Sequence, residues 1–564
     1  MSGKRSSKAV IPIHSARVQA RPKGRAVDPK ALGEIRALLA DSPRRRDLLI
    51  EYLHLIQDRC GHLSAAHLVA LAAEVNLAAA EVYEVASFYH HFDVVKEGES
   101  APPAITVRVC DSIACELAGA KDLLARLPAI LGRQVRVMAA PCVGRCDSAP
   151  VAVVGQNPIP QATTAGVSRA VTNKQTRCTA PRGIGYASYR RAGGYRLIAE
   201  CLSGKQSREA LTALMEDAGL RGLGGAGFPA GRKWRTVAAM PAPRLMAVNI
   251  DEGEPGTFKD RWYLERDPHR LLEGMLIAAW AAGVGEIYIY VRDEYAGCRA
   301  MLERELAKLK KNPPCALPPI HLRRGAGAYV CGEESAMIES IEGRRGMPRL
   351  RPPYVAEVGL FGHPTLEHNM ETLYWVRDII QKGARWFSGQ GRNGRRGLRS
   401  FSVSGRVKQP GVHLAPAGIT ARELIDEYCG GMQDGHRFYA YLPGGASGGI
   451  LPALMDNIPL DFDTLNPFGC FIGSAAIVVL SDADSAADAA RNLMKFFAGE
   501  SCGQCTPCRV GTVKAAALIE GNDWDQPLLA ELSQAMLDAS ICGLGQAAPN
   551  PVLSVMKYFP HEIA

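Results

Sequence analysis

Eight of the 16 cysteines in this 564-residue chain fall into two groups with the spacing of iron–sulfur ligands. The C-terminal group has the pattern C-x2-C-x2-C, followed by a distant fourth cysteine. In a [4Fe–4S] cluster, a short loop of this kind binds three irons and a remote cysteine binds the fourth. Zinc is disfavoured, because two successive two-residue gaps crowd three thiolates onto one face of a loop. The predicted ligands are Cys502, Cys505, Cys508 and Cys542.

The second group consists of two cysteine pairs, each placed after an apolar stretch with the alternating pattern of a strand. Thiolates at the ends of neighbouring strands can converge at one edge of a small α/β layer, where four of them can hold a [2Fe–2S] cluster. A structural zinc site is the alternative. The four- and three-residue gaps are wider than the knuckles of zinc ribbons, which favours the cluster. The predicted ligands are Cys110, Cys115, Cys142 and Cys146.

A glycine-rich loop at Gly219–Trp234 could bring backbone amides close to an anion, with Arg232 and Lys233 adding positive charge. It contains the G-x-G-x-x-G spacing of dinucleotide sites, which is a weak signal alone. A helix is expected before it, over residues 207–218, whereas the Rossmann fingerprint follows a strand. The sequence after Gly231 also fails the P-loop pattern. The loop therefore predicts a nucleotide site of another family.

Two further loops carry carboxylates. An expected strand at residues 245–248 leads into Asn249–Arg261, which is rich in glycine and acidic residues and suits hydrogen bonding to ribose or flavin hydroxyls. A solvated acidic turn is the alternative. A glycine turn at residues 325–327 opens an expected helix with Glu333 and Glu334, which point about 100° apart and are therefore expected to position a ligand rather than to act as an acid–base pair. The glycines at 444–449 are interpreted as a tight turn between elements.

Length and composition limit the class of protein. The chain should form several domains, and its 47% hydrophobic and 22% charged residues are ordinary for a globular protein. No apolar run is long enough to cross a membrane, and the basic N-terminal tail lacks the apolar core of a secretory signal. We interpret that tail as a flexible or subunit-docking arm rather than a nucleic-acid-binding one. Many cysteines without an export signal indicate a reducing, cytoplasmic location.

The motifs also constrain one another. Iron–sulfur clusters carry one electron at a time, whereas a nicotinamide nucleotide exchanges two as hydride. A chain that binds both needs a converter between them, and a flavin is such a converter. The set of motifs therefore predicts a flavin between a nucleotide site and two clusters.

Several of these segments resemble known proteins. Residues 222–234, 249–261, 325–339, 500–511 and 542–543 resemble the NADH-binding flavoprotein subunit of respiratory complex I, and residues 28–175 resemble its thioredoxin-like [2Fe–2S] companion. The two are fused here, as in the diaphorase subunits of NAD-linked hydrogenases and formate dehydrogenases. Residues 48–57, 93–98, 219–234 and 402–412 most resemble the beta subunit of molybdenum- or tungsten-dependent formate dehydrogenase.

The resemblance implies a multidomain α/β and α+β fold. Its expected parts are a basic tail (1–27), a helical bundle (28–98), a thioredoxin-like [2Fe–2S] domain (99–172), a linker (173–200), a Rossmann-like FMN and NAD(H) domain (201–398), a β-grasp-like domain (399–483) and a helical [4Fe–4S] domain (484–564).

The resemblance also implies ligand contacts, but no catalytic side chain, because hydride passes directly between flavin and nicotinamide. For NAD(H) it implies that Phe228 and Tyr354 flank adenine, with Glu254 and Glu334 near the ribose and nicotinamide. His368 and Thr236 depart from the family pattern, and Cys331 is expected to be structural. The implied FMN contacts are Gly222, Gly224, Gly225, Lys233, Asn249, Asp251, Glu252, Tyr329, Gly332, Glu333, Asn369 and Thr372.

The implied function is that of a diaphorase subunit in a hetero-oligomer. A partner alpha subunit with a molybdopterin-type molybdenum or tungsten cofactor and further iron–sulfur clusters oxidises formate, and electrons reach NAD+ through the [4Fe–4S] cluster and FMN. The [2Fe–2S] cluster acts as a temporary electron store. The alternatives are the diaphorase of a nickel–iron hydrogenase, a fused subunit of a complex I-like enzyme, and a zinc-stabilised scaffold without catalysis. No nucleic-acid partner and no membrane insertion are expected.

Overall fold

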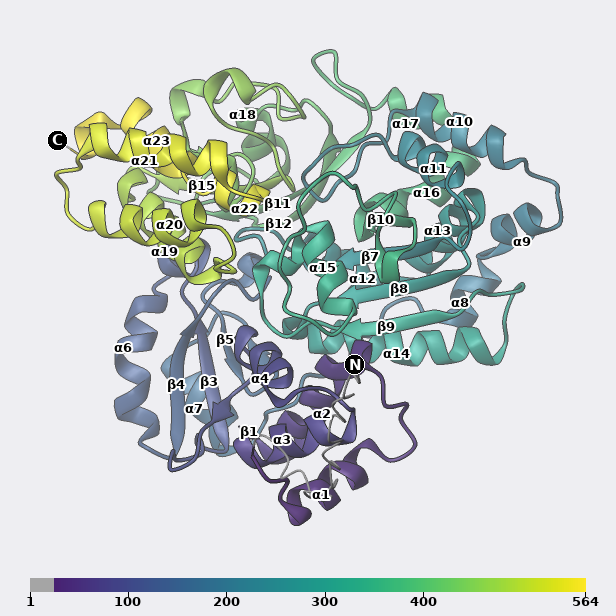
Figure 1. Ribbon diagram of the computed structural model, residues 1–564. Coiled ribbons are helices and arrows are strands. Elements are labelled where there is room, and N and C mark those ends of the chain that lie inside the picture. Colours follow the sequence, from purple (N-terminus) through teal and green to yellow (C-terminus); the bar gives the residue numbers. More distant parts are fainter. Residues whose placement is uncertain (1–24, 564) are drawn as a thin grey trace, which may run out of the picture.

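The computed structural model describes residues 25–563, so most of the expected basic tail lies outside the described residues. The described chain begins with a four-helix bundle that closes with a short parallel pair of strands (Figure 1). Its first helix starts at the capping residue Asp28, whose carboxylate accepts the Ala31 N–H at 2.9 Å, and has Pro29 at its first position. The elements are α1 (Pro29–Leu39), α2 (Leu49–Cys60), β1 (Leu63–Ser64), α3 (Ala65–Glu74), α4 (Ala79–Phe88) and β2 (Val94–Val95).

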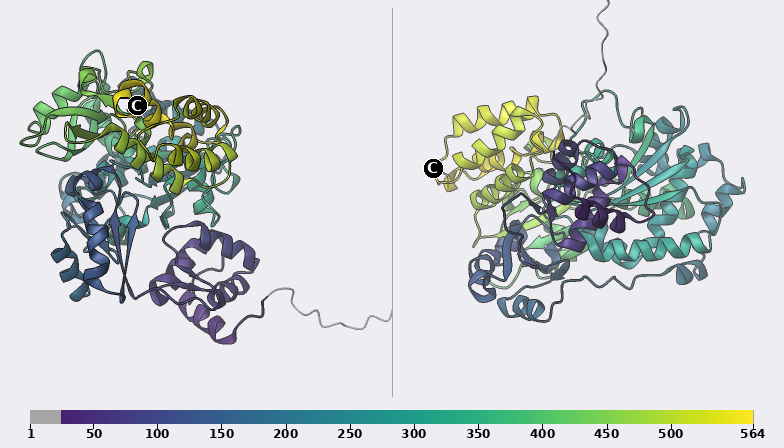
Figure 2. Two further views of the ribbon diagram at one scale, coloured as in Figure 1. Left: turned by 90° about the vertical axis from the view of Figure 1, so that its left-hand side faces the viewer. Right: turned by 60° about the horizontal axis from the view of Figure 1, so that its bottom comes forward.

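A small α/β domain follows the bundle, and its sheet has the strand order β4-β3-β5-β6. Strands β3 and β4 are parallel, while β5 and β6 run antiparallel. Figure 2 shows this domain and the bundle as separate lobes. The elements are β3 (Ile105–Cys110), α5 (Ile113–Leu117), α6 (Ala120–Leu131), β4 (Val135–Ala140), η2 (Cys146–Ser148), β5 (Ala152–Val154), β6 (Asn157–Ile159) and α7 (Thr164–Thr172).

The linker expected at residues 173–200 is only partly a linker, which corrects the sequence-based boundary. Helix α8 (Tyr186–Arg191) lies within it, α9 (Arg196–Leu202) begins within it, and both pack into the core of the next domain. The hydroxyl of Tyr189 donates to Glu273 at 2.7 Å, and the hydroxyl of Tyr195 lies 2.8 Å from His269 Nδ1. The irregular connection therefore ends near residue 185.

The central domain contains a four-stranded parallel sheet in the order β10-β7-β8-β9. Alternate residues of β7 face opposite sides: Met246 and Val248 pack against the helices of this domain, whereas Ala247 belongs to a core shared with the bundle. The elements are α10 (Arg208–Ala218), α11 (Ala230–Ala238), β7 (Leu245–Ile250), α12 (Lys259–Arg266), α13 (Pro268–Ala282), β8 (Glu286–Val291), η3 (Asp293–Tyr295), α14 (Ala296–Lys311), β9 (Ile320–Arg324), η4 (Tyr329–Gly332), α15 (Glu334–Ile341), η5 (Leu360–Gly362), β10 (Thr365–Asn369), α16 (Met370–Lys382) and α17 (Ala384–Ser388).

All four parallel strands of the central sheet end at one edge, and the segments after β7, β9 and β10 contain predicted site residues. The loop after β7 begins at Asp251, the turn after β9 contains Gly325, and β10 ends at Asn369. Ligands of open parallel sheets bind outside the carboxyl ends of the strands, so the topology brings these loops together at one place.

The β-grasp-like unit expected after the central domain is a five-stranded mixed sheet in the order β12-β11-β15-β13-β14, and a helical domain completes the chain (Figure 1). None of the helices within residues 25–563 is long and apolar enough to cross a lipid bilayer. The elements are β11 (Leu398–Gly405), β12 (Gly411–Pro416), α18 (Ala421–Glu423), the π-helix η6 (Leu424–Tyr428), β13 (Phe438–Leu442), η7 (Ala446–Gly448), β14 (Leu451–Pro452), η8 (Ala453–Met455), η9 (Asn466–Phe468), β15 (Ala476–Ser481), α19 (Ala486–Glu500), α20 (Thr506–Leu518), α21 (Gln526–Ala539), α22 (Gly543–Ala547), α23 (Asn550–Tyr558) and η10 (Pro560–Glu562).

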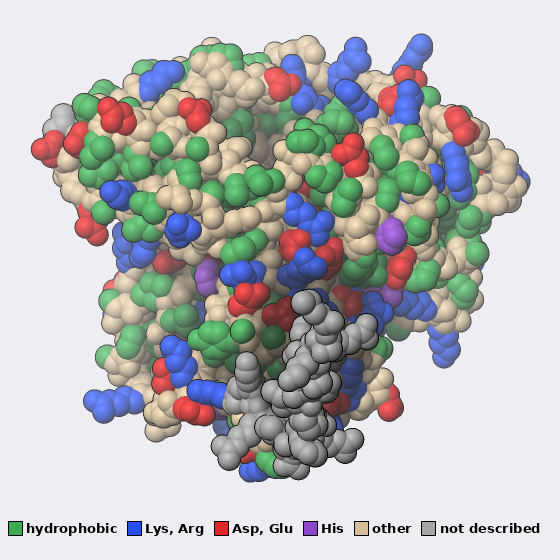
Figure 3. Space-filling model, viewed as in Figure 1, with side chains coloured by type: hydrophobic (Ala, Val, Ile, Leu, Met, Phe, Trp, Pro, Cys, Tyr) green, Lys and Arg blue, Asp and Glu red, His purple; other side chains and the backbone are tan. Residues whose placement is uncertain are grey.

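The bundle is joined to the central domain by ion pairs and hydrogen bonds at the end of β9. Arg323 pairs with Asp47 at 2.7 Å, and Arg324 pairs with Asp58 at 2.6 Å. His54 is buried and lies 2.9 Å from the carbonyl of Gly325. In the space-filling view, side chains of both charges gather in the middle of the face (Figure 3).

Candidate functional site: two cysteine clusters on either side of a nucleotide-type cleft

The four cysteines of the small α/β domain lie together in its interior. Cys110 ends β3, Cys142 follows β4, and the Sγ atoms of Cys142 and Cys146 are 3.4 Å apart. Contacts of Cys110 with Cys115 and Cys142 close the group. All four side chains are between 1% and 4% exposed. A buried set of four thiols, with no carboxylate or imidazole among them, fits an iron–sulfur cluster.

The loop that carries Cys142 and Cys146 is docked on the central domain by two buried arginines. Arg261 donates through Nε to the carbonyl of Gly144 at 2.8 Å and pairs with Asp147 at 2.8 Å. Arg292 donates through Nη2 to the carbonyl of Cys142 at 2.7 Å. The sequence analysis did not identify either arginine.

The four C-terminal cysteines line a small cavity between the ends of three helices and the turn η4. Gly503 adopts a left-handed backbone conformation with φ of 78°, which the short ligand loop requires. Arg509 donates to the carbonyl of Gly503 at 2.6 Å and secures the loop. Within the described part of the chain, no three His, Cys, Asp or Glu side chains converge tightly enough for a single metal ion. The cavity lining includes Cys502, Cys505, Cys508 and Cys542 together with Val330, Pro348 and Leu544.

The glycine loop packs against the start of α16 at the carboxyl edge of the central sheet. The N–H of Leu223 donates to Thr372 Oγ1 at 2.9 Å. A Cβ at Gly224 would lie 2.9 Å from the Cβ of Asn369, and one at Gly227 would lie 2.6 Å from the ring of Phe462. Side chains at these two positions would collide with the neighbouring segments, so glycine is required for this close approach.

A buried carboxylate oxygen without a partner lies near Gly332, after the end of β7. Asn249 donates to the carbonyl of Gly332 at 2.9 Å and accepts the N–H of Asp251 at 3.0 Å. Among the described residues, Asp251 Oδ2 is buried and has no hydrogen-bond partner, and burial raises the pKa of Asp251 well above its usual range. Buried polar atoms in proteins are normally satisfied, so this oxygen fits a ligand hydroxyl such as those of the FMN ribityl chain.

The side chains of three predicted flavin contacts, Glu252, Glu333 and Asn369, form hydrogen bonds within the protein. The carboxylate of Glu252 accepts the N–H of Asp260 at 2.8 Å and the Tyr295 hydroxyl at 2.8 Å, so it secures the start of α12. Glu333 is the N-cap of α15 rather than a residue within that helix. Asn369 is the N-cap of α16, and its Nδ2 donates to Asp260 at 2.7 Å.

Lys233 and the glutamates near it form a charged wall of the cleft. Lys233 pairs with Glu367 at 3.0 Å and lies 3.9 Å from Glu334. Arg351 contacts both Glu333 and Glu334, the latter at 3.2 Å. Glu333 and Glu334 therefore both contact the guanidinium group of Arg351, although adjacent residues point in different directions.

The two aromatic residues expected beside adenine are exposed on the surface of the central domain. Phe228 is 43% exposed and Tyr354 is 55% exposed, which suits stacking on a base. Thr236 is exposed and bonds only to the carbonyl of Arg232, at 3.0 Å. At the other departure from the family pattern, His368 is buried and accepts a hydrogen bond from Trp234 Nε1 at 2.9 Å.

Glu254 connects three segments that are far apart in the sequence, a contact that the sequence analysis missed. Its carboxylate accepts hydrogen bonds from the hydroxyl of Tyr329 and from the N–H of Ser447, the latter at 2.8 Å. A Cβ at Gly445 would lie 2.7 Å from the side chain of Glu254. The glycines at 444–449 are therefore part of the site, and not only a turn between elements.

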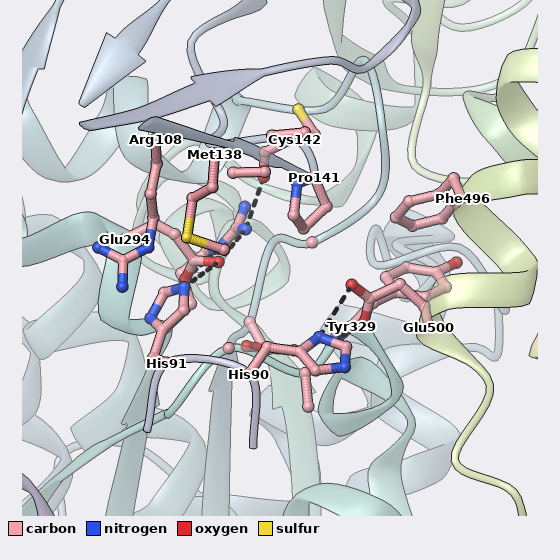
Figure 4. Close-up of a pocket in the computed structure, with 17 residues that line it drawn as sticks. His90, His91, Arg108, Met138, Pro141, Cys142, Glu294, Tyr329, Phe496 and Glu500 are labelled. Atoms are coloured by element: carbon pink, nitrogen blue, oxygen red, sulfur yellow. Dashed lines mark hydrogen bonds and ion pairs between the residues drawn. The ribbon is translucent and has the colours of Figure 1, made fainter. Parts of the chain in front are cut away.

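A small pocket of about 50 Å³ lies between Cys142 of the first cysteine cluster and Tyr329 of the turn η4 (Figure 4). Cys142 lies on one wall, and Tyr329 and Phe496 lie on the opposite wall with their rings 5.0 Å apart. Glu500 accepts the N–H of Tyr329 at 2.9 Å and lies 3.6 Å from His90. Because Tyr329 lines this pocket and its neighbour Val330 lines the C-terminal cysteine cavity, one turn of backbone separates the two spaces.

The fold and these sites define an iron–sulfur flavoprotein, and comparisons with known proteins agree. Residues 35–175 match the family of thioredoxin-like [2Fe-2S] ferredoxins, residues 215–378 match the Nuo51 FMN-binding domain, and residues 488–564 match the NADH-ubiquinone oxidoreductase-F iron-sulfur binding region. The chain is 40% identical over 397 residues to the NADH-quinone oxidoreductase F 2 subunit of Rhizobium meliloti (strain 1021), covering 68% of this chain and 94% of that protein. It is 39% identical over 402 residues to the NADH-quinone oxidoreductase F subunit of Aquifex aeolicus (strain VF5), covering 68% and 92%.

A solved structure of an NAD+-reducing [NiFe]-hydrogenase in the H2-reduced state superposes with a TM-score of 0.81 at 32% identity, over 92% of this chain and 93% of that chain. The chain therefore belongs to the family of NADH-quinone oxidoreductase F subunits, with a thioredoxin-like [2Fe–2S] domain fused to it. It is an NADH dehydrogenase or diaphorase module that transfers electrons between NAD(H) and iron–sulfur clusters through FMN. This confirms the predicted fold class and cofactors.

Proposed function

We propose that this chain is the NAD-reducing subunit of a formate dehydrogenase that catalyses formate + NAD+ → CO2 + NADH with a cytoplasmic, molybdenum- or tungsten-containing partner. The observation that supports a partner is the partial exposure of Cys502, Cys505 and Cys542, because an exposed cluster edge can exchange electrons with another protein. The resemblance of residues 48–57, 93–98, 219–234 and 402–412 supports formate as the donor.

Bound FMN would supply the conversion between hydride transfer and single electrons. The unpartnered oxygen of Asp251 and the side chain of Asn249 would hold its polar chain, while Gly224 lets the glycine loop approach Asn369 at the edge of the sheet. Lys233 would add positive charge at its phosphate end. The side chains of Glu252, Glu333 and Asn369 would act by fixing helix starts around the site.

Glu254 and Glu334 would orient the nucleotide. Burial raises the pKa of both carboxyl groups, and each is fixed by neighbours: Glu254 by Tyr329 and Ser447, and Glu334 by cationic side chains. Neither is placed to move a proton in hydride transfer, which requires none. The exposed rings of Phe228 and Tyr354 would hold adenine at the outer end of the cleft.

The test is to purify the native complex anaerobically and to identify the subunits and metals that accompany this chain. We expect a partner with molybdenum or tungsten, and NAD+ reduction that depends on formate. A nickel-containing partner with NAD+ reduction driven by H2 would contradict the proposal and support the second candidate.

That second candidate, the diaphorase of a nickel–iron hydrogenase, is favoured by one observation. The similarity to the solved hydrogenase chain extends over 92% of this chain, so the fusion of a [2Fe–2S] domain to the flavin domain also occurs there. A complex I-like role is the third candidate. The matches to two iron–sulfur families favour all three over a zinc-stabilised scaffold.

A further inference from the structure

Arg292 occupies an unusual position in the seam between the small α/β domain and the central domain. It follows directly after β8 and is 5% exposed. Its Nη2 donates to the carbonyl of Cys142 at 2.7 Å, and its Nη1 donates to the carbonyl of Glu252. One guanidinium group therefore bonds to a ligand loop of the first cysteine cluster and to the loop that begins with Asp251.

The other buried arginine of this seam does not make such a bridge. The guanidinium of Arg261 contacts Gly144 and Asp147 of the small domain and Glu265 on its own helix. It supports the ligand loop from one side only. Arg292 is thus the side chain whose planar group joins the backbone of both loops.

The charge on Arg292 also faces the cluster rather than solvent. Its carboxylate partner, Glu294, binds Nε at 3.1 Å and Nη2 at 2.8 Å and lies 3.8 Å from His91. The ring of Tyr295 lies 5.2 Å from the guanidinium carbon. Nη2 bonds directly to the backbone carbonyl of the ligand residue Cys142, so the guanidinium charge lies next to the ligand loop, where it can stabilise an added electron.

We infer that Arg292 is a positioning residue that ties the [2Fe–2S] ligand loop to the flavin loop and raises the reduction potential of the [2Fe–2S] cluster. Reduction adds one negative charge to a cluster held by four thiolates, and nearby buried charge and hydrogen bonds set the potential of such clusters. The inference rests on the proposed assignment of Cys110, Cys115, Cys142 and Cys146 as ligands.

The test uses the full chain, purified anaerobically with its cofactors, and two substitutions at one site. Arg292→Gln removes the charge and shortens the bridge, whereas Arg292→Lys keeps the charge but places its donors at one point instead of along a planar fork. Arg406→Gln is the matched control, because Arg406 forms a comparable ion pair with Asp484 at 2.7 Å in the mixed-sheet domain. The readouts are a redox titration followed by electron paramagnetic resonance and the rate of FMN release.

For Arg292→Gln we expect the ratio of reduced to oxidised [2Fe–2S] cluster at a fixed potential to fall about tenfold, a shift of about 59 mV for one electron. FMN release should become about fivefold faster, as expected when one hydrogen bond that supports the flavin loop is lost. Arg292→Lys should keep the wild-type potential but release FMN faster, and Arg406→Gln should change neither quantity.

An Arg292→Gln protein that behaves like Arg406→Gln in both measurements would overturn the inference. Should Arg292→Gln fail to retain its cluster, Arg292→Lys decides: faster FMN release at the wild-type potential supports the bridge, and unchanged release contradicts it. A wild-type protein without a [2Fe–2S] signal would refute the ligand assignment itself and the inference with it, while wild-type flavin and nucleotide binding would still stand.

Discussion

The two cysteine clusters differ in how the chain encloses them. The thiols of the small α/β domain are at most 4% exposed and are covered by Phe258 and two arginines of the central domain. In the C-terminal cluster only Cys508 is buried, at 5% exposed, and the other three are partly open. The enclosed cluster is surrounded by this chain's own residues, whereas the open one has ligand residues that reach the surface.

The surroundings of the open cluster support this difference. Helix α20, which begins just after Cys505, exposes Val510 at 39% and Val513 at 56%. These residues are three positions apart and lie on one side of the helix. The enclosed cluster is instead bordered by the buried ion pairs of Arg261 and Arg292. The open cluster therefore lies near an exposed apolar surface, and the enclosed cluster lies near buried charges.

Removing a ligand of the open cluster should have the largest effect. In Cys508→Ser, we expect the [4Fe–4S] signal to disappear and about four of about six irons to be lost, while the [2Fe–2S] signal remains because its ligands belong to a separate domain. Iron analysis and electron paramagnetic resonance measure this. The control Cys331→Ala removes a buried thiol of the central domain and should keep all the iron; loss of both signals in Cys508→Ser would contradict the independence of the two sites.

The difference in enclosure can be tested directly with a soluble iron chelator. We expect iron to leave the [4Fe–4S] site about tenfold faster than the [2Fe–2S] site, because chelator reaches the enclosed site only after local opening, and each ~1.4 kcal/mol of opening free energy is a factor of ten. The decay of the two resonance signals with time measures both rates. Equal rates would show that the enclosed site is not protected.

A smaller effect is expected at the two exposed aromatic residues that are predicted to contact adenine. Replacing Phe228 or Tyr354 with alanine should raise the Kd for NADH about tenfold, since an aromatic contact is worth about 0.5–1.5 kcal/mol beyond its buried area. Titration calorimetry on protein with both clusters measures it. Tyr83→Ala is the control, because Tyr83 is 42% exposed on the bundle; an equal effect there would argue against stacking at the cleft.

The smallest effect concerns the stability of the protein at acid pH. It involves His54, which is buried where the bundle meets the central domain. Burial lowers the pKa of His54 to about 3 from its ordinary value of 6.5, so the unfolded chain binds a proton that the folded chain does not. Stability from this group is complete above pH 6.5 and falls as the pH drops toward 3. In His54→Gln, the loss of unfolding free energy between pH 6.5 and 5.5 should be smaller by about 1 kcal/mol.

Urea unfolding at the two pH values measures this difference. His62→Gln, on the same bundle at a partly exposed position, is the matched control. A His54→Gln protein with the pH dependence of the wild type would contradict the assignment of the neutral, buried state to His54.

The sequence predicted the features that depend on local spacing. The ligand sets follow from short gaps between cysteines, and the structure brings together both sets as expected. The loop after β7 was found from the strand pattern before it, and the turn after β9 from its glycines. Asn369, at the end of β10, was identified only through the family resemblance. The structure groups these segments because parallel strands end at one edge of a sheet.

The features that were missed depend on contacts between distant segments. Ser447 meets Glu254, and Arg292 meets Cys142, across large separations in the sequence that carry no spacing signal. Glu252 was expected to face the ligand, but the donors that hold its carboxylate come from α12 and Tyr295. Helix α8 was missed because the expected linker is rich in residues typical of loops. Its buried Tyr186 and Tyr189 are three positions apart, a spacing that is compatible with one face of a helix.

The short connection near residues 173–185 has a consequence for assembly. The two bacterial NADH-quinone oxidoreductase relatives cover about two thirds of this chain, so the N-terminal third has no counterpart in them. A tether of this kind gives the small domain a millimolar local concentration at its docking site. The tether therefore removes part of the ~4–15 kcal/mol that two separate proteins lose in translational and rotational freedom when they associate, which lowers the cost of forming the seam of Arg261 and Arg292. Because the tether already holds the two domains together, Arg261 and Arg292 need to contribute less to the domains' affinity for each other.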